Sequence, residues 1–400
     1  MGSNGQAPEP TAPLHRPLLL WSLPFAFLGF GLPIFSKELG ATALEIGGLF
    51  SVFTAMTIIF RPVIGWAVDR FGRKHFFVIA LLIYSLAMGA FSLASDLAGL
   101  YLARILQGIG ASFLWISVNT MVADVTLPQD RGRAFGRIDE VTARGGLIGI
   151  FAGFFIISSM PNAFAWQITF IGYAAMAFLG AGLAWKNVPE TKPVTQAGTP
   201  QRFDLSWPLA ALLIVVFIMS ASEAMLGPIY LIFLQDKFTT HISKLAWAFL
   251  PAGLVTAFLA SRLGALSDRF NRIKMMALGL AGSGTISLAL PGAPSIPFLA
   301  ILYTFSAALW AISGPAVTAI FADLAGIERR GRSYGLFALV GSLGFVLGPI
   351  IGGILYDATA HSVPFFVNGC VLVMCSVWVR VFLRKLPRNT ERLERNTSYD

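Results

Sequence analysis

The chain contains few charged residues and almost no cysteine. Only 12 % of its 400 residues are Asp, Glu, Lys or Arg, about half of the fraction that soluble domains carry. A soluble protein of this length needs a charged surface, so the composition excludes an ordinary cytosolic enzyme and a disordered chain. The two cysteines, Cys370 and Cys375, share one apolar stretch. They exclude a secreted disulfide scaffold, and we expect both to be reduced and buried.

Long apolar runs stand where the charged residues are missing. Hydrophobic residues make up 56 % of the chain, 34 residues are Phe, and the mean hydropathy is +0.72. A helix needs about 20 mostly apolar residues to cross the bilayer core. The runs are continuous rather than alternating, which argues against a transmembrane barrel. The sequence therefore predicts an all-α integral membrane protein with twelve transmembrane helices, which begin near Pro17, Ile46, His75, Ala98, Ile138, Phe164, Trp207, Leu245, Ile273, Ile296, Gly335 and Pro364.

The basic residues gather on one side of these spans. If both termini lie inside, the outer loops hold three of the 29 Lys and Arg residues and the spans hold another three, which leaves 23 on the inner side. Lys and Arg are retained in cytoplasmic loops, so we expect a multi-pass protein of the cell membrane with both termini cytoplasmic. The net charge of +9 is then spread over many short loops, and no nucleic-acid partner is expected.

Three blocks of sequence recur at one fixed offset of 199 residues. The repeat predicts two parallel six-helix halves, at residues 17–185 and 207–386, joined by an irregular cytoplasmic linker at 186–206. A polar cytoplasmic N-terminus at 1–16 and a cytoplasmic tail at 387–400 flank them. The repeated positions are Gly65, Asp69, Arg70, Phe71 and Arg73 with Gly264, Asp268, Arg269, Phe270 and Arg272; Asp124 and Arg131 to Arg133 with Asp323 and Arg330 to Arg332; and Gly145, Gly149 and Gly153 with Gly344, Gly348 and Gly352.

Two motifs make the resemblance to a known family specific. Between the second and third runs stands Gly65-x-x-x-Asp69-Arg70-x-Gly72-Arg73-Lys74, and the fourth run holds Arg104-x-x-Gln107-Gly108-x-Gly110. The first motif resembles the cytoplasmic signature of the major facilitator superfamily, and the second is similar to a signature of its proton-coupled drug exporters. With the repeat, the resemblance covers nearly the whole chain. It implies the twelve-helix major facilitator fold and a transporter, mostly monomeric in this family, that uses a small-molecule substrate and protons.

A third pattern of the exporter branch is displaced. That branch usually carries Gly-x-x-x-Gly-Pro in the fifth helix, where this sequence has Gly145-x-x-x-Gly149-Ile150. The complete pattern stands in the eleventh helix as Gly344-x-x-x-Gly348-Pro349. Small residues let membrane helices approach closely, and both a packing role and a hinge role are open for these glycines.

The charged residues of the first motif predict a cytoplasmic latch. Gly72 permits a tight turn, and Asp69 can accept hydrogen bonds from the N-terminus of a facing helix. The resemblance implies that the facing helix is the eleventh and that Arg73 pairs with Asp124, so that the two halves are held in an outward-open state. Arg70 belongs to the same latch. The second copy, with Asn271 in place of the glycine, predicts a weaker clamp made of Asp268, Arg269 and Arg272. Alternatively, all these charges only fix the topology.

Ionisable residues inside the spans are the strongest indication of a pathway, since each costs at least about 2.5–3.5 kcal/mol in mid-bilayer. Glu223 lies near the middle of the seventh span and shares a helix face with Met219 and Tyr230. Its carboxyl group could exchange a proton for a cationic substrate, or form a structural hydrogen bond. Arg104 is a coupling candidate by resemblance, and snorkelling is its alternative. Its helix face also carries Gln107, Trp115 and Asn119, and Trp115 and Tyr230 would offer cation–π surface.

Glu140 and Arg144, four residues apart in the fifth span, predict an ion pair on one helix face. The pair could be structural or part of a gate. No Gly-rich nucleotide loop and no metal-ligand spacing of the four histidines are present, so we expect no catalysis, metal or cofactor. We expect proton-coupled export of an amphipathic or cationic compound by alternating access. Uptake or facilitated diffusion of a metabolite, and a non-transporting membrane sensor, remain open.

Overall fold

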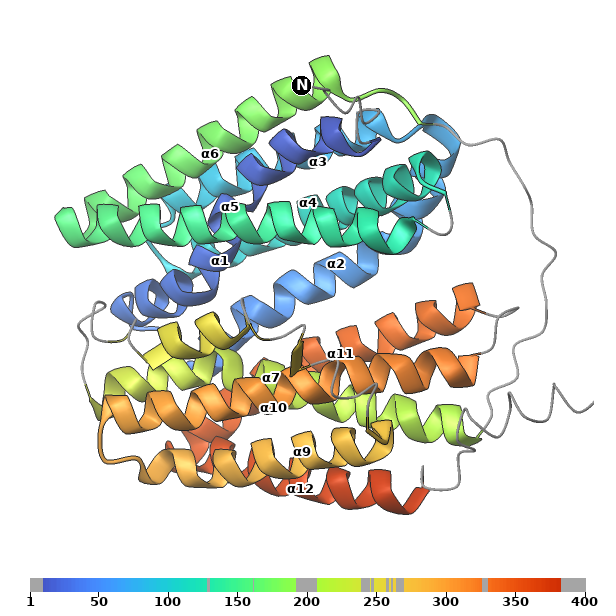
Figure 1. Ribbon diagram of the computed structural model, residues 1–400. Helices are drawn as coiled ribbons and strands as arrows, with labels where there is room; N and C mark the ends of the chain where they lie inside the picture. Colours follow the sequence, from blue (N-terminus) through green and yellow to red (C-terminus); the bar gives the residue numbers. More distant parts are fainter. Residues whose placement is uncertain are drawn as a thin grey trace, which may run out of the picture. The chain divides into compact units, whose positions relative to one another are not determined.

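The computed structural model describes residues 10–127, 130–160, 162–191, 207–238, 245, 248–256, 259, 262–263, 270–325 and 330–382. Every element in these ranges is helical (Figure 1). The elements are α1 (Ala12–Glu38), α2 (Ala43–Phe71), α3 (Lys74–Leu93), α4 (Leu97–Val125), α5 (Arg131–Ser159), α6 (Asn162–Asn187), α7 (Trp207–Lys237), α9 (Arg272–Ala289), the short 3-10 turn η1 (Leu290–Gly292), α10 (Ile296–Ala325), α11 (Arg330–Ala358) and α12 (Val363–Phe382).

Eleven helices of the described ranges are long and apolar enough to cross a membrane. The twelfth predicted span begins at Leu245. Residues 248–256 of that span are helical, and much of the remainder lies outside the described residues. The observed helices agree with the expected all-α membrane fold.

The chain divides into two compact units, residues 1–198 and 199–400. Helices α1 to α6, blue to green in Figure 1, belong to the first unit, and α7 to α12, yellow-green to red, belong to the second. Most of the expected linker at 186–206 lies outside the described residues, and its first two residues, Lys186 and Asn187, still belong to α6.

The two units use the same helix pairings. In the first unit, α3 packs on α4 and α6, and α1 packs on α5 and α6. In the second unit, α9 packs on α10 and α12, and α7 packs on α11 and α12. The internal sequence repeat is thus visible as a repeated arrangement of helices.

Glycines allow the closest of these pairings. A Cβ added at Gly149 would collide with the main-chain oxygen of Leu23, so α5 lies directly against the backbone of α1. A Cβ at Gly348 would collide in the same way with Ala221 O, which brings α11 against α7. Packing is therefore a role that these glycines fill in both units, as small residues do in membrane helix pairs.

Three helices begin earlier than their apolar runs indicate. α1 begins at Ala12, so residues 12–16 of the expected polar N-terminus are helical, with Pro13 in the first turn, where its missing N–H costs nothing. α5 begins at Arg131 and α11 at Arg330, seven and five residues before the predicted starts. Basic helical turns extend beyond an apolar core, and a hydropathy count does not detect them.

One local expectation was wrong. Cys375 is buried, but Cys370 is exposed, because positions five residues apart point to different sides of α12.

Asn271, which replaces the glycine in the second copy of the motif, is the N-cap of α9. Its φ is −64°, and its side chain accepts a hydrogen bond from Lys274 N at 3.1 Å.

Candidate functional site

A cavity of about 570 Å³ lies inside the second unit, between α7, α9, α10 and α12. Glu223 of α7 lines this cavity, and its side chain is accessible there. Gly227 and Tyr230, one and two turns further along α7, line it too. Met219 does not, although it was expected on this face, because its side chain is buried in the apolar core of the unit. The cavity therefore contains one carboxyl group on a wall that is otherwise apolar or uncharged.

Aromatic rings form part of the wall beside this carboxyl group. Tyr230 and Tyr303 stack at 4.4 Å between ring centroids, with 21° between their planes. Phe249 meets both rings edge-on, at 5.2 Å and 5.5 Å. Glu223 and Tyr303 line the same cavity. A cation near the carboxylate would therefore also find aromatic faces, which attract positive charge.

The cavity wall also offers polar atoms that are free to bind. Tyr230 Oη and Ser283 Oγ are buried and have no hydrogen-bond partner among the described residues. Asn368 is different, since its Nδ2 already donates to Ser222 O at 2.9 Å. Buried polar groups without partners are costly, so a molecule in the cavity gains by supplying partners to Tyr230 and Ser283.

Arg104 lies in the first unit in a tightly packed setting. Its side chain is 4 % exposed, and its Nη1 donates to Gln107 Oε1 at 2.8 Å. Gln107 Nε2 in turn donates to Tyr84 Oη at 2.9 Å. The guanidinium carbon lies 4.6 Å from the ring centroid of Phe50 and 5.2 Å from that of Phe53. The guanidinium thus remains inside the unit, with cation–π contacts, and it forms none of the ion pairs seen among the described residues.

Trp115 and Asn119 are not brought to the Arg104 guanidinium. Trp115 packs edge-on against Trp21 at 5.5 Å between ring centroids, and Asn119 is exposed. Trp21 also contacts Tyr84, at 5.3 Å. An aromatic connection therefore runs from Trp115 through Trp21 to the tyrosine that holds Gln107.

The loop between α2 and α3 brings the first-motif residues together around Arg73. This side chain is only 2 % exposed, and its Nε donates to Asp124 Oδ2 at 3.1 Å. Its Nη1 donates to Val68 O at 3.0 Å and its Nη2 to Asp69 Oδ1 at 3.2 Å. Arg73 thereby ties the end of α2 to the end of α4. Asp69 is otherwise accessible, with 73 % of its side chain exposed.

The other motif residues have separate positions. Arg70 lies over the aromatic rings of Trp66 and Phe71, at 5.5 Å and 5.7 Å. In the second copy, Arg272 is the first residue of α9, and Asp268 and Arg269 lie outside the described residues.

Glu190 is a functional candidate that the sequence reasoning missed. It follows α6, and its Oε1 accepts from Arg73 N at 2.6 Å while its Oε2 accepts from Lys74 N at 3.2 Å. These N–H groups open α3, so the carboxylate of Glu190 caps that helix. Gly72 has φ +100°, and a Cβ there would lie 2.6 Å from Glu190 Oε2. The sequence signal that could have indicated this cap is an acidic residue shortly after the sixth apolar run.

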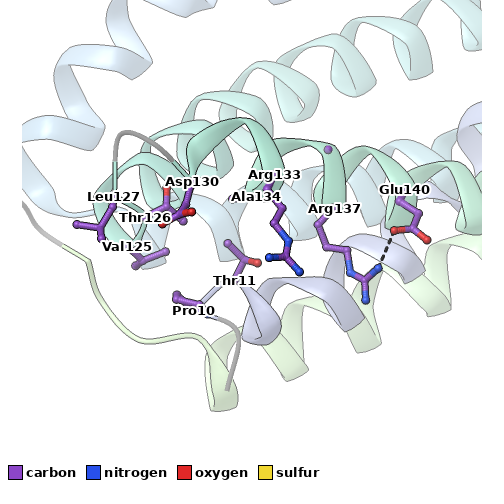
Figure 2. A pocket seen from close by; sticks show the side chains of 11 residues that line it. Pro10, Thr11, Val125, Thr126, Leu127, Asp130, Arg133, Ala134, Arg137 and Glu140 are labelled. Atoms are coloured by element: carbon purple, nitrogen blue, oxygen red, sulfur yellow. Dashed lines mark hydrogen bonds and ion pairs between the residues drawn. The ribbon is translucent and has the colours of Figure 1, made fainter. Parts of the chain in front are cut away.

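Glu140 lies between two arginines on α5. It contacts Arg144, as the spacing predicted, and also accepts from Arg137 Nη1 at 2.8 Å. Figure 2 shows this second bond beside a hollow of about 740 Å³, with Arg133 and Arg137 along its rim and Thr11 across from them. The side chains of Glu140 and Arg144 are 41 % and 61 % exposed, so the pair is accessible on the surface of the first unit.

Among the described residues, no group of three or more His, Cys, Asp or Glu side chains could hold a metal ion. The candidate machinery thus consists of a cavity with a carboxyl group and a buried arginine on membrane-spanning helices, and a polar loop that joins two of these helices.

Comparison with known proteins gives a consistent result. Residues 19–209 and 212–398 match the family described as Major Facilitator Superfamily. The chain is 30 % identical over 374 residues to Multidrug resistance protein 2 of Bacillus subtilis (strain 168), which covers 89 % of this chain and 92 % of that one. It is 24 % identical to Quinolone resistance protein NorA of Staphylococcus aureus, over 89 % of this chain and 93 % of that one.

Solved structures share the fold at low sequence identity. A bacterial homolog of the human lysosomal transporter Spinster, in an inward-facing and occupied conformation, aligns with a TM-score of 0.76 and 18 % identity, over 96 % of this chain and 98 % of that one. The nucleoside transporter NupG (D323A mutant) aligns with a TM-score of 0.71 and 15 % identity, over 94 % and 100 % of the two chains.

Proposed function

The chain belongs to the Major Facilitator Superfamily, and we propose that it exports small amphipathic cations in exchange for protons, with Glu223 as the exchanging group. It is a multi-pass membrane transporter rather than an enzyme, and it works by alternating access. Two relatives carry names that refer to multidrug and quinolone resistance, which supports export of organic compounds. We further propose that both termini are cytoplasmic and that the monomer is the working unit.

One observation carries this proposal: a single carboxyl group faces a cavity beside a stacked pair of tyrosines. The ionised carboxylate attracts a cation, and the rings of Tyr230 and Tyr303 add cation–π and apolar contact. When Glu223 takes up a proton, the attraction ends and the cation is released. The proton leaves on the opposite side of the membrane before the next cation binds. One site thus serves both ligands in turn, which couples their movements in opposite directions.

Arg104 supplies a fixed positive charge in the other unit. Its contacts with Gln107, Phe50 and Phe53 hold the guanidinium in place without neutralising it. We propose that this charge biases the proton affinity of the transport pathway and that Arg104 does not itself carry protons. Its role is to position charge, since an amide binds its Nη1 and aromatic rings cover its face, while its buried Nε has no hydrogen-bond partner among the described residues.

The loop around Arg73 is proposed as one side of a latch between conformations. Arg73 joins α2 to α4, and Glu190 joins α6 to α3. We propose that exposed Asp69 supplies the contact that forms in one conformation and breaks in the other, with the second copy around Arg272 in a weaker role. The glycines Gly145, Gly149 and Gly348 keep the helix pairs rigid during the change, and Pro349 lies in the same helix as Gly348.

The test uses the full chain in proteoliposomes with an imposed pH gradient and tetraphenylphosphonium as the cationic probe. We expect Glu223→Gln to abolish gradient-driven accumulation while leaving slow equilibration. Glu38→Gln is the matched control, since that exposed carboxyl group lies at the end of α1, and it should transport normally. Unchanged uphill transport by Glu223→Gln would overturn the proposal. If the unmodified chain only equilibrates the probe and does so independently of pH, the chain works by facilitated diffusion.

A further inference from the structure

An apolar groove runs along the surface of the α3–α6 pair in the first unit, separate from Glu223 and Arg104. Its volume is about 480 Å³. Val78 and Ala181 form a buried floor, while Leu82 and Phe178 form walls that are 41 % and 62 % exposed. Gly182 has no side chain to fill the space above the floor. The groove is therefore an apolar hollow on two helices that are long and apolar enough to span the membrane.

One end of the groove is basic and aromatic. His75 and Trp185 line this end, with 5.9 Å between their ring centroids. Lys74 Nζ lies 5.5 Å from the centroid of the Trp185 ring, and Lys186 is exposed on the next position of α6. The acidic group nearby, Glu190, faces His75 Nδ1 at 3.8 Å and is already engaged with the start of α3.

This distribution matches the chemistry of a phospholipid. Trp side chains prefer the boundary between hydrocarbon and headgroups, which puts Trp185 at headgroup depth and the rest of the groove within the hydrocarbon. Lys and Arg beside a membrane attract anionic headgroups by about 1 kcal/mol each. The groove thus offers apolar surface at chain depth, and two lysines stand beside its Trp185 end, Lys74 over the ring and Lys186 as the next residue of the chain.

We propose that this groove binds one anionic phospholipid, with an acyl chain along Val78, Ala181 and Gly182 and the phosphate at Lys74 and Lys186. The site differs in place and in chemistry from the cavity at Glu223, which has a carboxylate rather than ammonium groups. It does not depend on the exported compound or on proton coupling. The lipid acts as a bound component of the first unit.

The test is native mass spectrometry of the full chain, purified and delipidated in mild detergent and then titrated with phosphatidylglycerol or phosphatidylcholine of identical acyl chains. One phosphatidylglycerol should bind about tenfold more tightly than phosphatidylcholine. Glycerol phosphate, which lacks acyl chains, should not compete. Equal binding of the two lipids, or effective competition by glycerol phosphate, would overturn the proposal.

Two glycine variants locate the site. A Cβ at Gly182 meets no atom within 4 Å, so a larger side chain can start there, and Gly182→Phe places a ring in the groove. Gly172 lies on the same helix, is equally open and does not line the groove. We expect Gly182→Phe to weaken phosphatidylglycerol binding about tenfold and Gly172→Phe to leave it unchanged. Gly182→Leu serves as a second, smaller filler, and melting temperatures verify that each variant is folded.

The charge variant Lys74→Gln/Lys186→Gln separates headgroup from chain. It should bring the affinity for phosphatidylglycerol down to that for phosphatidylcholine, with little effect on the latter. If Gly182→Phe and Gly172→Phe bind phosphatidylglycerol equally well, the lipid does not bind in this groove. A dimer in the spectra that Gly182→Phe dissociates would also contradict the proposal, because a second copy of the chain would then fill the groove.

Discussion

The two units bury their key ionisable residues in opposite ways. Arg104 in the first unit is 4 % exposed and enclosed by Gln107 and two phenylalanine rings. Glu223 in the second unit faces a cavity of about 570 Å³. A packed charge stays in one state, whereas a charge at a cavity can exchange its partner. The two units thus share their helix pairings but place different polar chemistry within them.

Arg104→Met should give the largest effect. Met fills similar volume and removes the cost of a buried charge, but it also leaves the buried Gln107 Oε1 without its donor, so the melting temperature in detergent should change little. Gradient-driven transport should nevertheless be lost, because the fixed charge proposed to bias proton affinity is removed. Arg104→Lys, which keeps the charge but not the planar contacts, should retain part of the transport. A fully active Arg104→Met would remove Arg104 from the coupling mechanism.

Gly149→Ala and Gly348→Ala compare the packing of the two units. Both add a methyl group against a main-chain oxygen, of Leu23 and Ala221 respectively, and overpacking costs about 1–3 kcal/mol, occasionally more. We expect both to lower the melting temperature, and Gly149→Ala to do so more. Gly172→Ala, at an open position of α6, is the control and should not. Equal stability of all three would show that the helices can separate without cost.

Gly72→Ala and Asn271→Ala compare the two copies of the loop. Alanine at position 72 must adopt φ near +100° and approach the Glu190 carboxylate, and such backbone strain costs of order 1–3 kcal/mol. At position 271 only the cap to Lys274 N is lost, a cost of about 1 kcal/mol. Thermal melting should rank the variants accordingly. Adding Glu190→Ala to Gly72→Ala should restore the part of the unfolding free energy that the collision with Glu190 removes. A double-mutant cycle measures this part.

Tyr230→Phe should have the smallest effect on stability. Its hydroxyl group has no partner among the described residues, so its removal should leave the melting temperature unchanged or slightly higher. Binding of tetraphenylphosphonium, which forms no hydrogen bonds, should not change. Binding of a cation that carries a hydrogen-bond acceptor should weaken by several-fold, consistent with the loss of about 1 kcal/mol. Equal weakening for both probes would mean that the phenol acts through the shape of the cavity.

Much of the fold could be predicted from the sequence. Continuous apolar runs fix where helices lie, and the 199-residue offset between Gly149 and Gly348 indicates equivalent helices. The polar turns at Arg131 and Arg330 were missed, because helices continue beyond the bilayer where hydropathy gives no signal.

The candidate site was predictable only in part. The spacing of Arg104 and Gln107 on one helix predicts that they can meet, and they do. Tyr303 and Ser283 were not predicted, because which face of α9 and α10 turns toward α7 depends on packing among distant segments. Glu190 was missed for a similar reason, since its partners at Arg73 and Lys74 lie more than one hundred residues away.

The most direct test of the central claim measures protons released when a cation binds. Purified full chain in weakly buffered detergent is mixed with tetraphenylphosphonium while a pH-sensitive dye records free protons. If Glu223 exchanges one ligand for the other, the unmodified chain and Glu38→Gln release up to one proton per bound cation, most strongly at the pH where Glu223 is protonated before binding, and Glu223→Gln releases none. Proton release from Glu223→Gln that equals that of the unmodified chain would contradict the account.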